Sequence, residues 1–442
     1  MSKSKLKPLQ IEATIPVLGS AKVASPLPRC NFTPDNAAVR VDLTEDELGF
    51  VPETPIYHEF EKAGPRAKIF FEPTKTKCAI VTCGGLCPGL NDVIRAIVME
   101  AHHNYKVAAV LGIRFGLQGF IPSYGHDIME LDPQRVADIH QFGGTILGSS
   151  RGPQPADEVV DALERMNISI LFMIGGDGTM RAAQHIVDEI KARKLKISLI
   201  GIPKTIDNDI NFVSRSFGFD TAVEKATEAI QCAHVEAQGA VNGIGLVKVM
   251  GRDAGFIAAQ ATLALKEVNF VLVPENPFTL EGPGGLIPGL EQRLKERQHA
   301  VILCAEGAGQ DLTQSTGQQD ASGNKQLADI CSVLSEKIKA HFKASHTEIT
   351  LKFIDPSYMI RSVPANANDR IYCGFLGQHA VHAAMSGRTG MVVSNLKSHY
   401  VHLPVALVCG KGKRLNTQSD YWRAVLESTG QADFMEAPHF CP

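Results

Sequence analysis

The sequence lacks any apolar run close to the roughly 18 residues that a membrane-spanning helix needs, and its N-terminus lacks the apolar core of a secretory signal. Lysine and arginine are scattered through the 442 residues and the formal net charge is -3, so no basic stripe is available for nucleic acid. Residues 1–8 carry three lysines but lead into prolines rather than an amphipathic helix, and residues 439–442 form no peroxisomal signal. We therefore expect a cytoplasmic protein whose partners are neither membranes nor nucleic acids.

The sequence also lacks a cysteine and histidine set with the spacing of a zinc site. Of its ten cysteines only Cys83 and Cys87 are close together, and no second Cys or His pair lies nearby, so we interpret this segment as a loop with small side chains. Most of the others lie in apolar runs, which favours reduced core thiols over disulfides: Cys78, Cys232, Cys304, Cys331, Cys373 and Cys409.

What the sequence does contain is a repeated strand-then-helix pattern. Residues 1–75, rich in proline and charge, predict an N-terminal extension that wraps a neighbour or is partly disordered. From about Lys77 onward the alternation predicts an α/β protein with mainly parallel sheets and helices on both faces. The expected strands are 78–83, 107–113, 168–174, 196–203, 244–250, 269–274, 300–305 and 350–354; the expected helices begin at Leu90 and cover 180–193, 221–238 and 328–345, and residues 307–326 predict a surface loop.

Two loops within about thirty residues suit phosphate binding. Gly175-Gly176-Asp177-Gly178-Thr179 follows one buried strand, and the segment from Lys204 to Asp209 follows the next. Glycines in a strand-to-helix turn let the backbone approach an anion, and the following helix offers unpaired amides. Because ligands collect at the carboxyl ends of parallel strands, we expect both loops to face one crevice.

Asp177 lies where a carboxylate would repel a polyphosphate unless a divalent cation bridges the two, which favours Mg²⁺. Its alternative role is to cap the helix that follows.

The second loop, Pro203-Lys-Thr-Ile-Asp-Asn-Asp209, combines a cation, a hydroxyl and two carboxylates. In a kinase one carboxylate accepts the proton of the attacking hydroxyl, while a lysine neutralises charge on the transferring phosphoryl group. If Asp207 and Asp209 lie close together, we expect at least one perturbed pKa.

Arginines follow further predicted strands, at Arg252 in Met-Gly-Arg, at Arg361 and at Arg370. Each alone is more often a surface ion pair, but together they indicate a site for phosphate or transition-state charge.

Together these segments resemble the 6-phosphofructokinase family, from about Lys77 to Met391. Gly-Gly-Asp-Gly-Thr alone is also found in NAD kinases and lipid kinases, whereas the Lys204–Asp209 motif, Met-Gly-Arg and Gly144-Thr-x-Leu-Gly-Ser-Ser-Arg151 make the resemblance specific. The resemblance implies two Rossmann-like domains and phosphoryl transfer to the 1-hydroxyl of fructose 6-phosphate. The donor domain would comprise residues 76–220 completed by 356–395, and the sugar-phosphate domain residues 221–355 joined by part of 396–442.

The resemblance also implies a role for each motif residue. Asp207 would be the general base, assisted by Asp209, with Thr205, Lys204 and Arg252 completing the catalytic set. Asp177 would hold Mg²⁺. The donor side would be lined by Gly85, Arg151, Gly176, Gly178 and Thr179, and the sugar phosphate would be surrounded by Thr205, Asp207, Met250, Gly251, Arg252, Glu306, Tyr358, Arg361 and Arg370. Asn208 would brace the loop.

The phosphoryl donor follows from two positions. Family members that use pyrophosphate resemble one another in having Asp where this sequence has Gly178. Glycine leaves room at this position for the inner phosphates of a nucleotide, so we expect ATP to be the phosphoryl donor. Lys204 departs from the glycine of common bacterial ATP-dependent enzymes and is similar to the plant and trypanosomatid branch, which keeps pyrophosphate as an alternative.

Two different functions stay open on the sequence. One is a kinase for NAD or a lipid, which would leave Met-Gly-Arg unexplained; the second is a catalytically silent sensor of nucleotide or sugar phosphate. The resemblance implies a nucleotide-regulated homotetramer. Gly243 stands where the bacterial pattern has an arginine contributed across a subunit interface, so that phosphate contact is not expected here.

Overall fold

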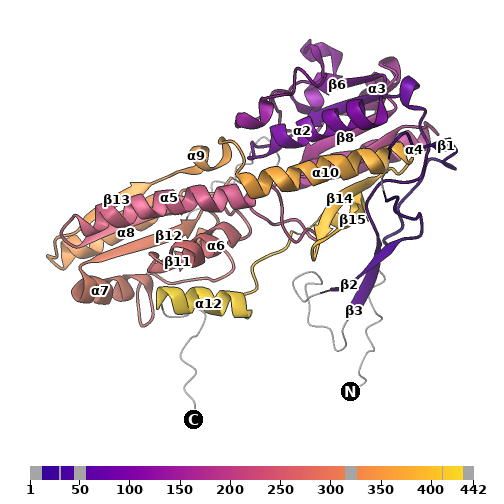
Figure 1. The fold of residues 1–442 in the computed structure, drawn as a ribbon. Coiled ribbons are helices and arrows are strands. Elements are labelled where there is room, and N and C mark those ends of the chain that lie inside the picture. The colour runs from indigo at the N-terminus through magenta and orange to yellow at the C-terminus, as the bar shows by residue number, and fades with distance from the viewer. Residues whose placement is uncertain (1–11, 29–30, 44–55, 314–325, 411, 432–442) are drawn as a thin grey trace, which may run out of the picture.

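The computed structural model describes residues 12–28, 31–43, 56–313, 326–410 and 412–431. They form two lobes, each built on its own β-sheet with helices on both faces (Figure 1). We call the lobe with seven strands the first lobe and the lobe with four strands the second lobe. The expectation of an α/β protein with mainly parallel sheets is confirmed.

The sheet of the first lobe has the strand order β15-β14-β9-β8-β5-β6-β7. Its five central strands run parallel: β5 (Lys77–Thr82), β6 (Ala109–Ile113), β8 (Ile170–Gly175), β9 (Ser198–Pro203) and β14 (Met391–Leu396). The edge strands β7 (Ile128–Glu130) and β15 (His399–Pro404) are antiparallel to their neighbours. Every residue of β8 and β9 is buried, as expected for parallel strands covered on both faces.

Alternate residues of these strands face two separate apolar layers. On one face Ile80, Phe172 and Ile200 pack with the helices α2 (Leu90–Met99) and α10 (Ala367–Met385). On the other face Val81, Met173 and Leu199 pack with α3 (Ala156–Arg165), α4 (Asp177–Ala192) and α11 (Val405–Val408). This two-residue period decides which face of the sheet each helix covers.

The sheet of the second lobe has the order β11-β12-β10-β13, and all its strands are parallel. They are β10 (Gly243–Val249), β11 (Phe270–Leu272), β12 (His299–Ala305) and β13 (Thr350–Ile354). The helices α5 (Phe219–Gln238), α6 (Phe256–Leu265) and α12 (Asp420–Thr429) pack on one side; α7 (Leu286–Arg297) and α8 (Ile330–Ala344) pack on the other. The short helix α9 (Ser357–Arg361) follows β13.

The two lobes are joined where α10 and α5 meet end to end (Figure 1). Asp369, in the first turn of α10, accepts hydrogen bonds from the backbone N–H of Gly218 (2.9 Å) and from the N–H and hydroxyl of Thr221 (2.8 and 2.6 Å). A carboxylate at two helix N-termini is favoured by the unpaired amides of both. The junction therefore fixes the start of α5 relative to α10.

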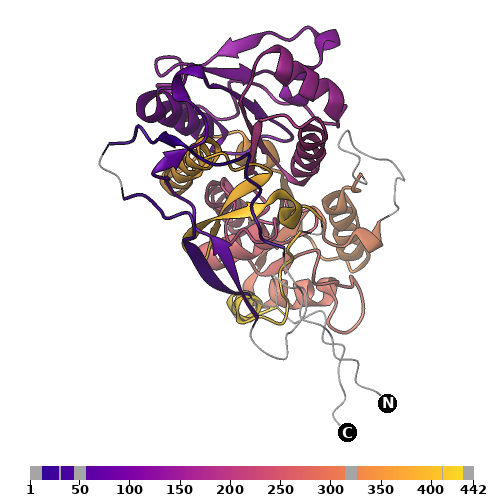
Figure 2. The same ribbon diagram turned by 90° about the vertical axis from the view of Figure 1, so that its right-hand side faces the viewer.

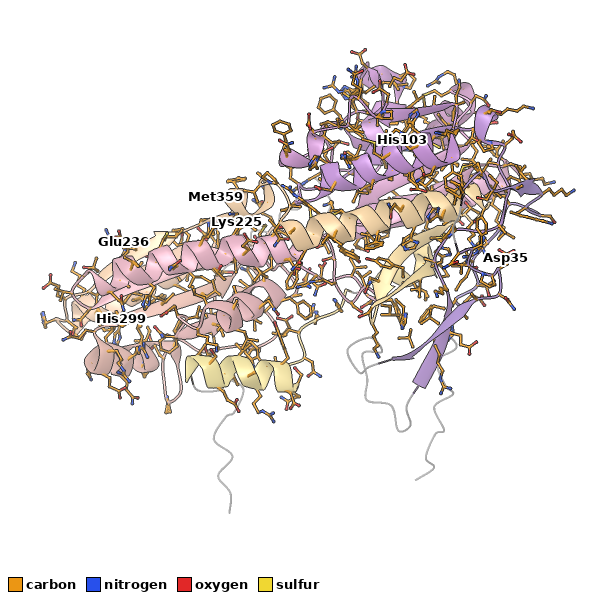
Figure 3. The ribbon with its side chains drawn as sticks, in the orientation of Figure 1. Asp35, His103, Lys225, Glu236, His299 and Met359 are labelled. Atoms are coloured by element: carbon orange, nitrogen blue, oxygen red, sulfur yellow. The ribbon has the colours of Figure 1, made fainter. Side chains whose placement is uncertain are left out.

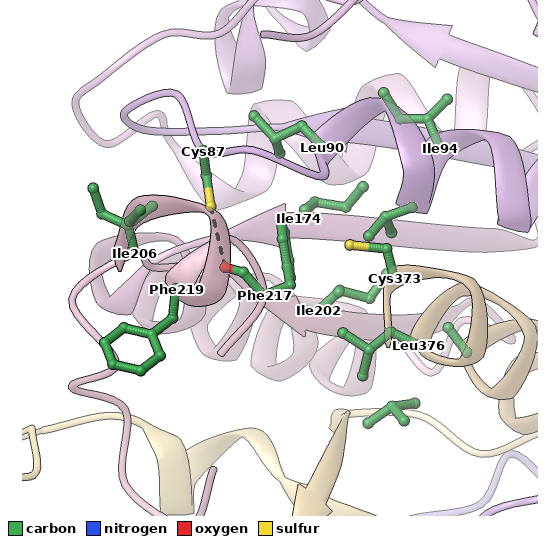
Figure 4. Close-up of a cluster of buried hydrophobic side chains, with 14 of the residues drawn as sticks. Cys87, Leu90, Ile94, Ile174, Ile202, Ile206, Phe217, Phe219, Cys373 and Leu376 are labelled. Atoms are coloured by element: carbon green, nitrogen blue, oxygen red, sulfur yellow. Dashed lines mark hydrogen bonds between the residues drawn. The ribbon is translucent and has the colours of Figure 1, made fainter. Parts of the chain in front are cut away.

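Apolar packing reinforces this junction directly behind the second phosphate loop. Figure 4 shows Ile206, Phe217 and Phe219 beside Cys87 of the loop after β5, and the Cys87 thiol donates to the Phe217 carbonyl (3.2 Å). Burial raises the pKa of the Cys87 thiol. Cys87 therefore packs in the core, as do the other buried cysteines. Cys232 is exposed, so the expectation that it is a core thiol is wrong, and Cys409 is only half-buried.

The described parts of residues 1–75 form strands that pair with one another on the same chain, which the weak local periodicity did not predict. β1 (Val23–Ala24) pairs with β4 (Lys68–Ile69), and β2 (Ala38–Leu43) pairs with β3 (Ile56–Glu61). Glu61 accepts hydrogen bonds from His402 (2.7 Å), from Arg66 (3.1 Å) and from Arg388. Asp35, labelled in Figure 3, pairs with both arginines. These partners are distant in sequence, which explains why local periodicity did not reveal the strands.

Two further expectations are settled only in part. Of the loop expected at 307–326, residues 314–325 lie outside the described part, and Gln310–Leu312 form a single 3₁₀ turn. Among the described residues, no helix is both long and apolar enough to span a bilayer.

Glu61 allows a test of how the N-terminal hairpin is held. Burial alone would raise its pKa, but hydrogen bonding and charge from His402 and Arg388 outweigh burial and lower the pKa from 4.5 to about 2. Replacing Glu61 by Gln removes the shared carboxylate and should destabilise the fold by about 3 kcal/mol near pH 7. Because the folded pKa is the lower one, the lost stability should shrink as the pH falls from 4.5 towards 2.

Thermal unfolding across this pH range measures the effect. Glu59→Gln, at an exposed position of the same strand, is the matched control and should leave Tm unchanged. Equal Tm values for the wild type and Glu61→Gln at pH 7 would contradict the account.

Candidate active site

Three loops meet at the carboxyl edge of the first sheet, because the strands that deliver them are parallel neighbours. β8 and β9 pair in a register that sets Gly175 opposite Pro203, and the Lys204 N–H donates to the Gly175 carbonyl (2.9 Å). On the other side of β8, the Cys83 N–H donates to the Ile174 carbonyl (2.9 Å). The prediction that the two phosphate loops share one edge is confirmed, and the Gly84-Gly85 turn joins them there.

Lys204 ties the second loop to the Gly84-Gly85 turn. Its side chain is buried, and its ammonium donates to the Gly85 carbonyl (2.7 Å). Burial lowers the pKa of Lys204, and the nearby positive charge of Arg151 acts in the same direction. A Cβ atom added to Gly85 would lie 3.6 Å from the guanidinium of Arg151, so this exposed arginine stands at the same turn. Lys204, Gly85 and Arg151 therefore form one group.

The Gly-Gly-Asp-Gly-Thr loop begins helix α4 at Asp177. Gly176 is the N-cap residue and no side chain caps the helix, so the alternative that Asp177 is the cap is wrong. The Asp177 carboxylate instead pairs with Arg181 (2.8 Å) and accepts from the Gly410 N–H (3.4 Å). A Cβ atom added to Gly178 would meet nothing within 4 Å, so the space beside it is open.

Thr179 lies differently from its loop neighbours. Its side chain is buried and packs against Gly175. A Cβ atom added to Gly175 would come within 2.2 Å of the Thr179 hydroxyl oxygen. Gly178, rather than Thr179, therefore forms the open surface of this loop, whereas an added Cβ at half-buried Gly176 would lie 3.3 Å from the Lys204 carbonyl oxygen.

Asp207 is the most strongly perturbed acid of this edge. Its Oδ1 atom is buried and has no hydrogen-bond partner within the part of the chain that the structure describes. Burial raises the pKa of Asp207 well above its ordinary value, the negative charges of Asp209 and Glu306 raise it further, and Lys204 only partly opposes them. Burial also raises the pKa of Asp209, against a hydrogen bond from the Thr205 hydroxyl. The expectation of a perturbed pKa is confirmed.

Asn208, between the two acids, braces the loop as expected. Its φ is 55°, a left-handed conformation that asparagine tolerates better than most residues. Its side-chain carbonyl accepts from the Ser216 N–H (3.0 Å) and from Lys413 (3.2 Å). The Thr205 hydroxyl oxygen in turn accepts from the Asp207 N–H (3.1 Å).

The second lobe contributes the Met-Gly-Arg loop at the end of β10. Gly251 has a φ of 132°, and its carbonyl accepts from the Gly307 N–H (3.1 Å), which brings Glu306 beside this loop. Burial raises the pKa of Glu306, while the positive charges of Arg252 and Arg361 lower it. Met250, Gly251, Arg252, Glu306 and Arg361 thus form a second group, and the effect of Glu306 on Asp207 links it electrostatically to the first.

Tyr358 and Arg370 lie nearer the surface. Tyr358 is 73% exposed on α9, and the Arg361 guanidinium lies 4.7 Å from the centre of its ring. Arg370, exposed on α10, donates to the Ala365 carbonyl (2.7 Å) and lowers the pKa of Asp92, which burial raises to about 6. Of these predicted sugar-phosphate residues, Arg361 therefore lies close enough to Glu306 to affect its pKa, whereas Arg370 lies beside Asp92 of α2.

Sequence reasoning missed two acids of this site. The charge of Asp253 raises the pKa of both Asp207 and Asp209, and its place directly after Arg252 could have drawn attention to it. Glu275 accepts from the Gly255 N–H (3.1 Å) and from the Leu415 N–H (2.8 Å). No local motif marks Glu275, because its partners come from distant segments.

A family model described as "Phosphofructokinase" matches residues 77–384. The chain belongs to the phosphofructokinase family. Sequence reasoning set the start of the resemblance at the same residue and the end close by. The family assignment is therefore confirmed.

Several curated relatives carry the same family name. An "ATP-dependent 6-phosphofructokinase" of Borreliella burgdorferi is 52% identical over 84% of this chain and 85% of its own. An "ATP-dependent 6-phosphofructokinase 1" of Arabidopsis thaliana is 47% identical over 91% and 87%, and an "ATP-dependent 6-phosphofructokinase" of Trypanosoma brucei brucei is 49% identical over 84% and 76%. The predicted likeness to plant and trypanosomatid ATP-dependent members is confirmed.

A solved structure supports the fold. The pyrophosphate-dependent phosphofructokinase of Marinobacter aquaeolei aligns with a TM-score of 0.66 over 81% of this chain and 92% of its own, at 19% identity. At that identity the likeness establishes the fold alone.

The buried charge of Asp207, beside other carboxylates, predicts a gain in stability on its removal. Because the folded pKa is raised, ionised Asp207 disfavours the native state at every pH above its unfolded pKa of about 3.9. Asp207→Asn should therefore raise Tm at pH 7.5, by about 1 °C for each kcal/mol relieved in a chain of 442 residues. Scanning calorimetry at pH 7.5 and at pH 4 measures this. The gain should be smaller at pH 4, and a lower Tm of the variant at pH 7.5 would contradict the prediction.

Proposed function

We propose that this protein transfers the terminal phosphoryl group of ATP to the 1-hydroxyl of fructose 6-phosphate, giving fructose 1,6-bisphosphate and ADP. The names of relatives that are 47–52% identical over most of the chain support both substrates. The observation that carries the chemistry is Asp207: a buried carboxylate with an unpartnered oxygen and a raised pKa, at the edge where the loops of both lobes meet. Such a group is suited to accept a proton from a bound hydroxyl.

In this proposal Asp207, ionised, takes the proton of the sugar 1-hydroxyl as that oxygen attacks phosphorus. Asp209 and Glu306 keep the affinity of Asp207 for that proton high. Thr205 orients the Asp207 backbone through its hydroxyl oxygen and also binds the Asp209 carboxylate. Lys204, whose ammonium now lies on the Gly85 carbonyl, neutralises charge on the transferring phosphoryl group.

The donor binds along the glycine-rich loops of the first lobe. Gly176 and Gly178 line a surface at the N-terminus of α4 that is open beside Gly178 and where unpaired amides favour phosphate, and Gly85 and Arg151 lie at the adjoining turn. Buried Thr179 supports this surface from below.

Asp177 would hold Mg²⁺. Its carboxylate would bind the cation together with substrate phosphates, the usual arrangement for Mg²⁺ in phosphoryl-transfer sites. When bound, Mg²⁺ supplies positive charge that neutralises the phosphate oxygens. The pair with Arg181 would open to free the carboxylate.

The sugar phosphate binds against the second lobe and α9. Arg252 and Arg361 flank Glu306 and offer planar donors to the 6-phosphate, with Arg370 approaching from α10. Met250, Gly251, Glu306 and Tyr358 surround the sugar. The first lobe thus serves as the donor domain and the second as the sugar-phosphate domain. A homotetramer and a cytoplasmic location remain predictions of the sequence.

The donor is tested by position 178. Because the space beside Gly178 is open, Gly178→Asp should fold normally while its carboxylate repels the inner phosphates of ATP, and the rate with ATP should fall by at least ~10²-fold, about 2.7 kcal/mol. Gly178→Ala, which adds only a methyl group, is the matched control and should keep the rate within about fivefold.

Both variants and the wild type are assayed with fructose 6-phosphate and either ATP or pyrophosphate. Wild-type turnover with pyrophosphate alone would mean that Lys204 outweighs Gly178 and would overturn ATP as the donor.

The base is tested by Asp207→Asn, which should lower kcat by at least ~10²-fold while fructose 6-phosphate binding largely survives. For the wild type, kcat/KM should fall as the pH drops through the raised pKa of Asp207, since only the ionised form accepts a proton. Stopped assays from pH 5 to 9 give the profile. An unchanged rate in the variant would remove Asp207 from this role.

A further inference from the structure

A crossing segment reaches the catalytic loop from outside the family match. We call residues 409–419, between α11 and α12, the connector; position 411 lies outside the described part. The connector runs from the first lobe to the second (Figures 1 and 2). Within it, the Lys413 N–H donates to the Asp209 carbonyl (2.9 Å). The family model ends at residue 384, so the connector is not part of that match.

The Lys413 side chain holds the turn that contains both catalytic acids. Its ammonium donates to the Asn208 side-chain carbonyl (3.2 Å), the Val213 carbonyl (2.7 Å) and the Ser214 carbonyl (3.2 Å). A left-handed residue such as Asn208 persists only where its surroundings determine it strongly. Since Asn208 separates Asp207 from Asp209, its conformation sets the direction of both carboxylates.

The connector lies against the loop with no spare room. A Cβ atom added to Gly412 would come within 2.3 Å of the Asp209 carbonyl oxygen. Two residues after Lys413, the Leu415 N–H donates to the Glu275 carboxylate. This carboxylate also accepts from the N–H of Gly255, at the start of α6. Gly255 closes the loop that carries Arg252. Through the connector backbone and the Glu275 carboxylate, these hydrogen bonds therefore link the Asp209 loop of one lobe to the Arg252 loop of the other.

Lys413 also supplies positive charge to Asp209. The groups that face Asp209 are the carboxylates of Asp207 and Asp253, the Thr205 hydroxyl and the Lys413 ammonium, of which Lys413 and Thr205 favour the ionised form. Without Lys413 the pKa of Asp209 would rise further.

We propose that Lys413 is a positioning residue for phosphoryl transfer. It fixes the Asn208 turn so that Asp207 and Asp209 face the acceptor. Together with Glu275 it also fixes the position of that turn relative to the Arg252 loop. The inference rests on the proposed function, and the residue acts through Asn208 and Asp209 rather than through the substrates.

Lys413→Met tests the inference, since it keeps the length of the side chain and removes its charge and hydrogen bonds. We expect kcat to fall by about 10–100-fold with both KM values within about threefold, because a misplaced base affects chemistry more than binding. The acidic limb of the kcat profile should move to higher pH, and Lys413→Arg, which keeps the charge, should recover most of kcat.

Lys196→Met is the matched control. The Lys196 ammonium also donates to a distant backbone carbonyl, that of Leu18 (2.7 Å), but far from the catalytic loop. This variant should change neither kcat nor the pH profile. A fall in Tm for Lys413→Met with unchanged kcat and pH profile would mean a structural role only and would overturn the inference.

A second readout does not depend on the reaction. Hydrogen exchange of the backbone amides at 207–216 should be faster in Lys413→Met and in Gly412→Ala than in the wild type or Lys196→Met. If the wild type fails to phosphorylate fructose 6-phosphate, the proposed function is wrong, and exchange alone decides whether Lys413 holds the loop. Unchanged exchange would overturn the positioning role.

Discussion

The site depends on the parallel register of β5, β8 and β9. This pairing sets Gly175 opposite Pro203 and ends three strands at one edge, so the Gly84-Gly85 turn, the Asp177 loop and the Asp207 loop meet although they are up to about 120 residues apart. The Lys204 bond to Gly85 then closes this group. A shift of one residue in β9 would turn its apolar side chains to the wrong faces, so the burial that stabilises the sheet also fixes the site.

The cost of the arrangement is a concentration of negative charge. Burial raises the pKa of Asp207, Asp209 and Glu306, and the charges of Asp209 and Glu306 raise that of Asp207 further, with Lys204, Arg252 and Lys413 as the nearby cations. Such a cluster opposes folding at neutral pH, and the high proton affinity that it gives Asp207 suits the role of base proposed for it. The surrounding hydrogen bonds, from Ser216 to Asn208 and from Thr221 to Asp369, hold a geometry that charge repulsion would otherwise loosen.

The sequence was sufficient for features that are local. Apolar runs located β5, β6, β8 and β9 but not β14, and the polar residues directly after these strands located the loops, because strand ends and turns are encoded within a few residues. Features that depend on distant partners were not visible. The β2–β3 hairpin requires Arg388 and His402, and the brace on Asn208 requires Lys413 from 205 residues away. Cys232 lies in an apolar stretch of α5 yet faces solvent, since only one side of that helix packs on its sheet.

The central claim is that the described edge transfers phosphoryl groups to the 1-hydroxyl of fructose 6-phosphate. The most direct measurement is ³¹P NMR of the purified protein with fructose 6-phosphate, ATP and Mg²⁺. The account predicts a new phosphate-ester resonance at C1 of the sugar that grows in step with ADP. A resonance that appears only when pyrophosphate replaces ATP would contradict the choice of donor, and the absence of any sugar 1-phosphate with either donor would contradict the function itself.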